Sequence, residues 1–93
     1  MMKKKTLGII GGMGAAATAD LFQKIVAVTD AKNDREHIPV VIDNNTMIPD
    51  RTAFLLSNNK RENPKKDLIE SAEKLRSYGA EILMIACNTA HYF

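Results

Sequence analysis

The fold is decided by residues 6–15, which read TLGIIGGMGA. An apolar run over residues 6–10 leads directly into a glycine-rich segment, residues 11–14, and this pattern predicts a buried strand that ends in a tight turn. From residue 15 to about residue 30 the apolar side chains recur at helical spacing, which predicts an amphipathic helix. A strand joined to a helix by a glycine turn is typical of an α/β fold.

The same alternation continues along the chain. Residues 39–43 (PVVID) and 81–86 (EILMIA) predict two more buried strands, and residues 51–56 predict a short helix. A longer helix is predicted over residues 64–79, because an Asn-Pro start signal precedes it and a glycine ends it. Apolar strands that alternate with amphipathic helices predict a parallel sheet covered by helices on both faces. We therefore expect one α/β domain.

Composition and charge exclude several classes of protein. The 93 residues suffice for one small domain, and a net charge of +2 is too small to predict binding to nucleic acid or to an anionic membrane. The single cysteine excludes an intrachain disulfide, and without CxxC spacing no metal site is expected. No apolar run approaches the roughly 20 residues that span a bilayer, and glycines interrupt the apolar stretch near the amino terminus. We expect a cytoplasmic protein.

Small or polar residues follow each predicted strand. The glycine segment at residues 11–14 follows the first strand, Asp43-Asn44-Asn45 follows the second, and Cys87-Asn88-Thr89 follows the third. Ligands of open parallel sheets bind at the carboxyl ends of the strands. We therefore expect these three segments to converge on one crevice.

The glycine segment allows three interpretations. Gly12-x-Gly14-x-x-Ala17 satisfies a dinucleotide-binding fingerprint, with Asp43 as its acidic partner at the next strand end. That fingerprint is weak evidence by itself. Asp43 also lies farther along the chain than the acidic residue of the fingerprint, which is expected about 20 residues on. The same glycines suit a plain tight turn, or an anion cradle formed by backbone N–H groups at a helix N-terminus.

Cys87 and Arg51 are the candidate reactive and binding side chains. A lone cysteine after an apolar strand is by default a small buried side chain. Residues 89–92 resemble the first turn of a helix, however, and a thiol at a helix N-terminus is more reactive as a nucleophile or base. Arg51 has two interpretations. It is either an exposed arginine paired with Asp50, or its planar guanidinium binds a carboxylate through two hydrogen bonds.

Three segments together resemble the aspartate/glutamate racemase family, in particular its aspartate racemases. They are GGMG at residues 11–14, NTMIPDRT at 45–52 and ACNTAH at 86–91, and the similarity extends from Lys5 to Phe93. The resemblance implies a cofactor-independent racemase with two similar flavodoxin-like α/β domains and an active site between them. Residues 1–93 would then be part of the amino-terminal domain, a three-layer arrangement with three strands of an incomplete sheet, and the second domain is absent from this chain.

The resemblance also implies roles for individual residues. Cys87 matches the first of two catalytic cysteines, and Asn88 and Thr89 match residues that hold the α-carboxylate and amino group of the substrate. Arg51 matches a residue that binds the side-chain carboxylate, and Met13 lies in the loop that lines the site. A thiolate on one face removes the Cα proton and a thiol on the other face returns one, which needs no cofactor and no metal.

The sequence departs from the family pattern in two places. Cys87 has no second cysteine in the chain, and Ala15 replaces a proline that often follows the glycine loop. We therefore expect a homo-oligomer or a missing second domain, and no activity of this chain by itself. Two alternatives to a racemase of aspartate or glutamate remain, a non-catalytic carboxylate-binding module and a nucleotide-binding fragment.

Overall fold

The fold is a parallel sheet with helices on both of its faces. The structure is a computed structural model and describes residues 4–58, 62–87 and 93. Its strands are β1 (Leu7–Gly11), β2 (Val40–Asn44) and β3 (Ile82–Ile85), and both pairings are parallel, in the order β2-β1-β3. That is the order in which a flavodoxin-like sheet begins. The predicted α/β class is confirmed.

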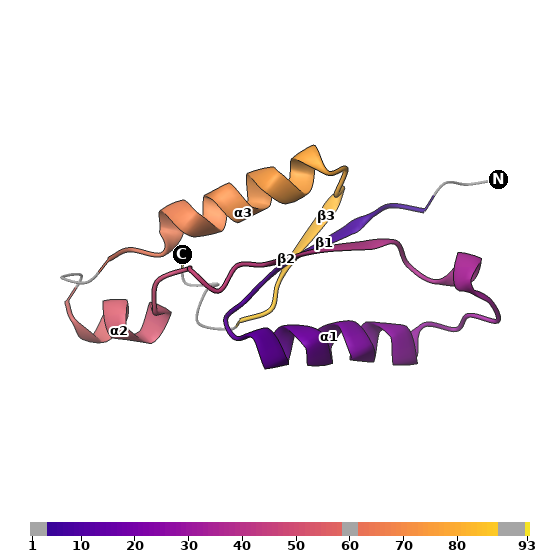
Figure 1. The fold of residues 1–93 in the computed structure, drawn as a ribbon, viewed down its shortest axis with the longest axis horizontal. Coiled ribbons are helices and arrows are strands. Elements are labelled where there is room, and N and C mark those ends of the chain that lie inside the picture. Colours follow the sequence, from indigo (N-terminus) through magenta and orange to yellow (C-terminus); the bar gives the residue numbers. More distant parts are fainter. Residues whose placement is uncertain (1–3, 59–61, 88–92) are drawn as a thin grey trace.

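The helices lie close to their predicted positions. Those described are α1 (Ala15–Val28), α2 (Arg51–Leu56) and α3 (Lys65–Ser77), with one turn of 3₁₀-helix at Asp34–Glu36. Figure 1 shows α3 on one side of the strands and α1 on the other, while α2 lies beyond one end of the sheet. None of the helices in the described ranges is long and apolar enough to cross a membrane.

Local signals explain where α3 begins and ends. The side-chain oxygen of Asn63 accepts a hydrogen bond from the Lys65 N–H at 2.9 Å, which satisfies one of the free donors of the first turn. At the other end Gly79 has φ of +95°, a conformation that glycine adopts without strain and that commonly stops a helix. The predicted start and stop of this helix are confirmed.

The hydrophobic core lies between the sheet and α3. Its buried members come from β1, the glycine turn, the loop after β2 and α3 itself; they are Ile10, Met13, Ile48, Leu68 and Leu75. On the opposite face of β1, Ile9 is also fully buried, at 0% exposure. The central strand is therefore covered on both faces, as its continuous apolar sequence predicts.

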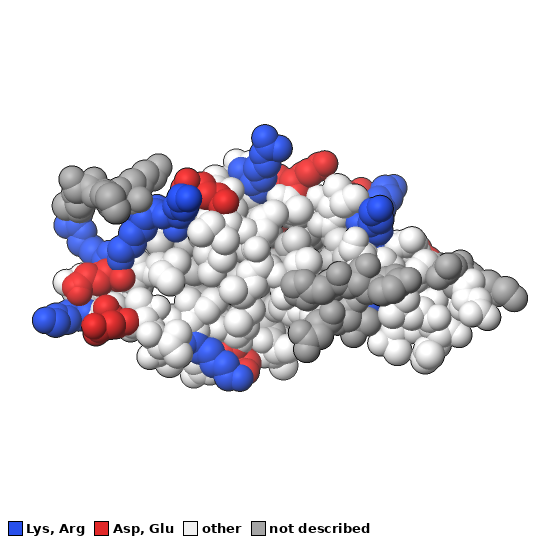
Figure 2. All heavy atoms as spheres, turned by 180° about the vertical axis from the view of Figure 1, so that it is seen from behind, with Lys and Arg blue, Asp and Glu red and all other residues white. Residues whose placement is uncertain are grey.

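Two apolar surfaces are less covered than their patterns predict. On α1 the only buried residue is Thr18, while Phe22 and Val26 are 39% and 41% exposed. On β3, which is an outer strand of the sheet that the described residues form, Ile82 and Leu83 are 50% and 46% exposed. The described sheet is three strands wide, and it leaves apolar side chains of α1 and of β3 exposed. Figure 2 shows a broad area without charged side chains in the middle of one face of the molecule.

The burial of Leu75 gives a test of this packing. Leu75 is 1% exposed, and we expect Leu75→Ala to lower the free energy of unfolding by about 3 kcal/mol, because the substitution leaves a cavity. Leu83→Ala is the matched control and should cost about 1 kcal/mol, since Leu83 already contacts water. Urea unfolding followed by circular dichroism measures both. Equal losses for the two variants would contradict the described core.

Candidate active site

The three strands end at the same level of the sheet. Ile10 of β1 is in register with Asp43 of β2 and with Ile85 of β3. The N–H of Ala86 still donates to the carbonyl oxygen of Ile10 at 3.0 Å, so Cys87 follows directly beyond the paired region. Three segments therefore lie at the carboxyl end of the sheet, as the sequence predicts. They are the glycine turn, the start of the loop after β2, and Cys87.

The glycine turn packs backbone against backbone on the loop after β2. Gly12 has φ of +96°, and a Cβ at this position would overlap the backbone of Asn45. The Asn45 N–H donates to the carbonyl oxygen of Gly11 at 3.1 Å and joins the two segments. Glycine is thus required at position 12 both by conformation and by space.

Thr18 holds the turn against α1. Its hydroxyl accepts a hydrogen bond from the Gly12 N–H at 3.0 Å and donates to the carbonyl oxygen of Gly14 at 2.9 Å. A Cβ on Gly11 would overlap the Thr18 side chain, so the glycine there permits this close approach. The sequence analysis missed Thr18. The available signal was a single threonine within the alanine-rich first turns of the helix.

Arg51 opens α2, and its guanidinium is turned back over its own loop. One terminal nitrogen, Nη1, donates to the carbonyl oxygens of Pro49 at 3.3 Å and Ile48 at 3.5 Å. Its Nε is buried and has no acceptor among the residues that the structure describes. One interpretation of the sequence pairs Arg51 with Asp50. In the structure Asp50 instead caps α2, because its carboxylate accepts a hydrogen bond from the Ala53 N–H at 2.8 Å.

Cys87 is half-buried and packs against the core cluster that contains Met13 and Ile48. Met13 is itself only 7% exposed and belongs to the core cluster on which Cys87 packs. The predicted partners Asn88 and Thr89 lie outside the described residues. Of the five predicted site residues, the structure thus places Met13, Arg51 and Cys87 at the same edge of the sheet.

Asp43 faces the helix layer rather than the glycine turn. One of its carboxylate oxygens lies 3.7 Å from the Lys74 ammonium on α3. The other oxygen is buried without a hydrogen-bond partner in the described part of the chain. The Asp43 carboxylate is therefore engaged with Lys74 of α3, which does not favour it as the acidic partner of a dinucleotide.

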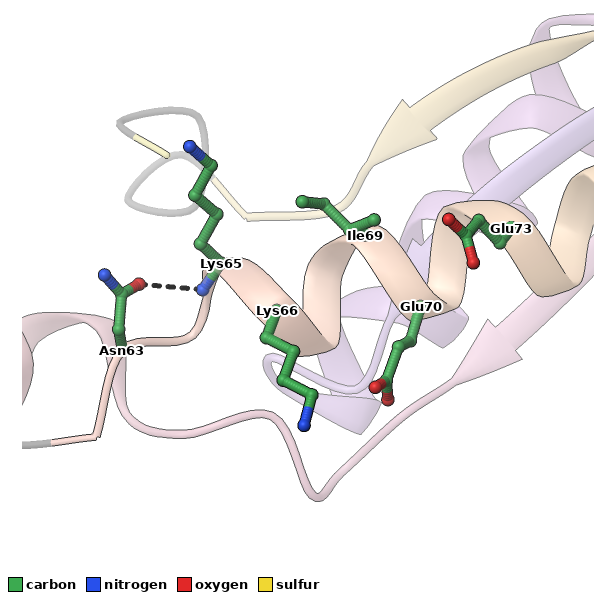
Figure 3. Close-up of a pocket in the computed structure, with 6 residues that line it drawn as sticks. All are labelled: Asn63, Lys65, Lys66, Ile69, Glu70 and Glu73. Carbon is green, nitrogen blue, oxygen red and sulfur yellow. Dashed lines mark hydrogen bonds between the residues drawn. The ribbon is translucent and has the colours of Figure 1, made fainter.

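Two hollows of the described surface lie along α3. One of about 460 Å³ is lined by Asn63, Lys65, Lys66, Ile69, Glu70 and Glu73. Figure 3 shows Lys65 and Ile69 pointing to one side of α3 and Lys66 and Glu70 pointing to the other. A second hollow of similar volume lies between α3 and β3. Within the described ranges, His, Cys, Asp and Glu side chains form no cluster of three that could hold a metal ion.

Comparison with known proteins identifies the family. Residues 10–93 match the family model described as Asp/Glu/Hydantoin racemase. The chain belongs to this racemase family. The matched region contains the glycine turn, Arg51 and Cys87.

A solved racemase structure has the same fold. The structure of Picrophilus torridus aspartate racemase is 39% identical to this chain and superposes with a TM-score of 0.86. The match covers 94% of this chain and 37% of that chain, so this chain spans well under half the length of that relative. The racemase resemblance expected from the three sequence segments is confirmed.

The close approach at Gly12 can be tested against a glycine of the same conformation. Gly79 has φ of +95° but nothing within 4 Å of a Cβ, so Gly79→Ala should cost about 1–2 kcal/mol of unfolding free energy from the backbone conformation alone. Gly12→Ala should cost about 2 kcal/mol more, since its Cβ also meets the backbone of Asn45. Urea unfolding of the two variants gives this difference. A difference of zero would show that the two loops are not in contact.

Proposed function

We propose that this chain supplies one half of the active site of a cofactor-independent racemase of acidic amino acids. The observation that carries the proposal is the position of Cys87, a half-buried free thiol directly beyond β3 and level with the glycine turn. Membership of the Asp/Glu/hydantoin racemase family supports a racemase over a binding module. The site residues of the proposal are Cys87, Arg51 and Met13, together with Asn88 and Thr89.

The proposed chemistry begins at Cys87. Its thiolate removes the Cα proton of the amino acid, the thiol is formed, and the electron pair spreads into the α-carboxylate as an enolate-like anion. Residues 15–17 are exposed at the N-terminus of α1, and the backbone N–H groups of the first turn of a helix are suited to this negative charge. Asn88 and Thr89 are proposed to hold the α-carboxylate and the amino group. Thiol and backbone amides suffice for these steps, and the proposal therefore includes no cofactor.

Arg51 is the proposed determinant of substrate class. A guanidinium with a buried Nε that lacks an acceptor in the described structure is suited to a carboxylate, which accepts two parallel hydrogen bonds from such a group. The side-chain carboxylate of aspartate or glutamate would supply those acceptors. The related solved structure is an aspartate racemase, which favours aspartate as the first substrate to test.

The second half of the proposed site comes from outside these residues. Racemisation needs an acid on the opposite face of Cα, and the chain contains one cysteine. We propose that this group belongs either to a further domain of a longer protein or to a second copy of the chain. Within the described sheet β3 is an outer strand, and an outer strand is suited to either arrangement because it can accept another strand.

Exchange of the α-proton in D₂O tests Cys87. A single base reaches only one face of Cα, so we expect the chain to exchange the α-proton of one aspartate enantiomer with retention of configuration. Proton NMR of the Cα–H signal follows the exchange, and chiral chromatography follows racemisation. Cys87→Ser should reduce the exchange rate about 100-fold or more, since a serine hydroxyl is a far weaker acid and base.

The same experiment separates the alternatives. Racemisation that falls on dilution would place the second acid in a second copy. Exchange that persists in Cys87→Ser would refute the assignment of the base. Binding of L-aspartate without exchange in either protein would support the carboxylate-binding module instead.

Binding measurements test Arg51. We expect Arg51→Met to weaken binding of L-aspartate about 10- to 100-fold, the usual loss when a hydrogen bond between charged groups is removed. Arg35→Met, which removes an exposed arginine of the 3₁₀ turn, is the control and should leave the affinity unchanged. Isothermal titration calorimetry gives both values. Equal affinities for the two variants would exclude Arg51 from the site.

A further inference from the structure

Asn45 lies where three parts of the chain meet. Its backbone N–H donates to the carbonyl oxygen of Gly11 at 3.1 Å. Its side-chain Oδ1 accepts from the Met47 N–H at 3.1 Å, and its Nδ2 donates to the Ser71 hydroxyl at 3.1 Å. A backbone N–H can only donate, so the amide oxygen must face Met47 and the NH₂ group must face Ser71. The side chain therefore has one orientation and joins its own loop to α3.

Ser71 occupies a position where a polar side chain is unfavourable unless it is bonded. It is 0% exposed, on the face of α3 that Leu68 and Leu75 present to the core. A buried hydroxyl is tolerated where it has a hydrogen-bond partner, and Asn45 provides one. Alanine is the better helix former and would suit the core as well. The bond to Asn45 thus accounts for a serine at this position.

The loop that begins at Asn45 carries Arg51. In its middle Ile48 is 5% exposed and anchored in the core, and at its end Asp50 caps α2. The guanidinium of Arg51 rests on carbonyl oxygens of this same loop. The position of Arg51 relative to the glycine turn therefore depends on how the first residue of the loop is held. Ser71 on α3 holds that first residue, Asn45, through the hydrogen bond between its hydroxyl and the Asn45 side chain.

We propose that Asn45 and Ser71 are a positioning pair that places Arg51 for capture of the side-chain carboxylate. The proposal rests on the proposed role of Arg51. Neither member of the pair touches the substrate. Without the Ser71 hydroxyl, the Asn45 side chain keeps its bond to the Met47 N–H but loses its tie to α3, so the turn to Met47 loosens. Arg51 then samples more positions, and two-point binding of a carboxylate, which demands fixed geometry, is weakened.

The test is the affinity for L-aspartate, measured by NMR titration of the chain. We expect Ser71→Ala to raise the dissociation constant about tenfold, a loss typical of imperfect placement of one charged contact. Ser77→Ala is the matched control, because Ser77 lies on the same helix and its hydroxyl donates to the Lys74 carbonyl, away from the loop. It should leave the dissociation constant within about twofold of the unsubstituted chain.

A double-mutant cycle separates positioning from a general effect on the fold. If Ser71 acts through Arg51, then Ser71→Ala should change affinity less than about twofold in the Arg51→Met background. A tenfold loss that persists without Arg51, or no loss in Ser71→Ala alone, would overturn the proposal. Thermal unfolding of each variant shows that the binding data come from folded protein.

Failure of the proposed function is distinguishable from failure of this inference. If the unsubstituted chain does not bind L-aspartate, the role of Arg51 as a carboxylate ligand is refuted. The positioning pair is then judged by two signals that need no ligand, the Arg51 Nε–H resonance and hydrogen exchange at the Met47 amide. Both should change in Ser71→Ala and not in Ser77→Ala. Unchanged signals in Ser71→Ala would overturn the pair.

Discussion

The contact between the backbones of Gly12 and Asn45 is the constraint on which the candidate site depends. It joins the turn after β1 to the loop after β2, and no side chain larger than hydrogen fits at position 12. Around it, Thr18 ties the turn to α1 and Ser71 ties the loop to α3. This contact therefore helps to place the N-terminus of α1 and the arginine that opens α2 relative to each other.

Most of the fold could be predicted because its signals are local. Apolar runs, glycine stops and the Asn-Pro start are readable within a few residues, and the helices and strands begin within a residue or two of their predicted positions. The cover over α1 could not be predicted in this way. Whether Phe22 is buried depends on which elements lie opposite it in space, and periodicity identifies the apolar face of a helix without identifying what packs on it.

The candidate site was predictable at the level of topology. Strand order alone places the glycine turn, Arg51 and Cys87 at one edge, whereas their proposed roles rest on the resemblance to racemases. Thr18 and Ser71 escaped the sequence analysis because a small hydroxyl on a helix gives no signal until its partner is known. Asp43 was misleading for the opposite reason. A carboxylate at a strand end suggests a ligand, but one oxygen of Asp43 lies 3.7 Å from the Lys74 ammonium of α3.

The central position of β1 also affects how the domain assembles. Among the described strands β1 comes first along the chain, and its neighbour β3 comes last. Pairing Leu7 with Ile82 closes a loop that contains α1, β2 and α3, and such long-range parallel pairing is slow because the loop entropy is lost before contacts compensate it. During synthesis β1 leaves the ribosome long before β3. β1, the most deeply buried of the described strands, therefore gains its second partner only after residues 82–85 have been synthesised.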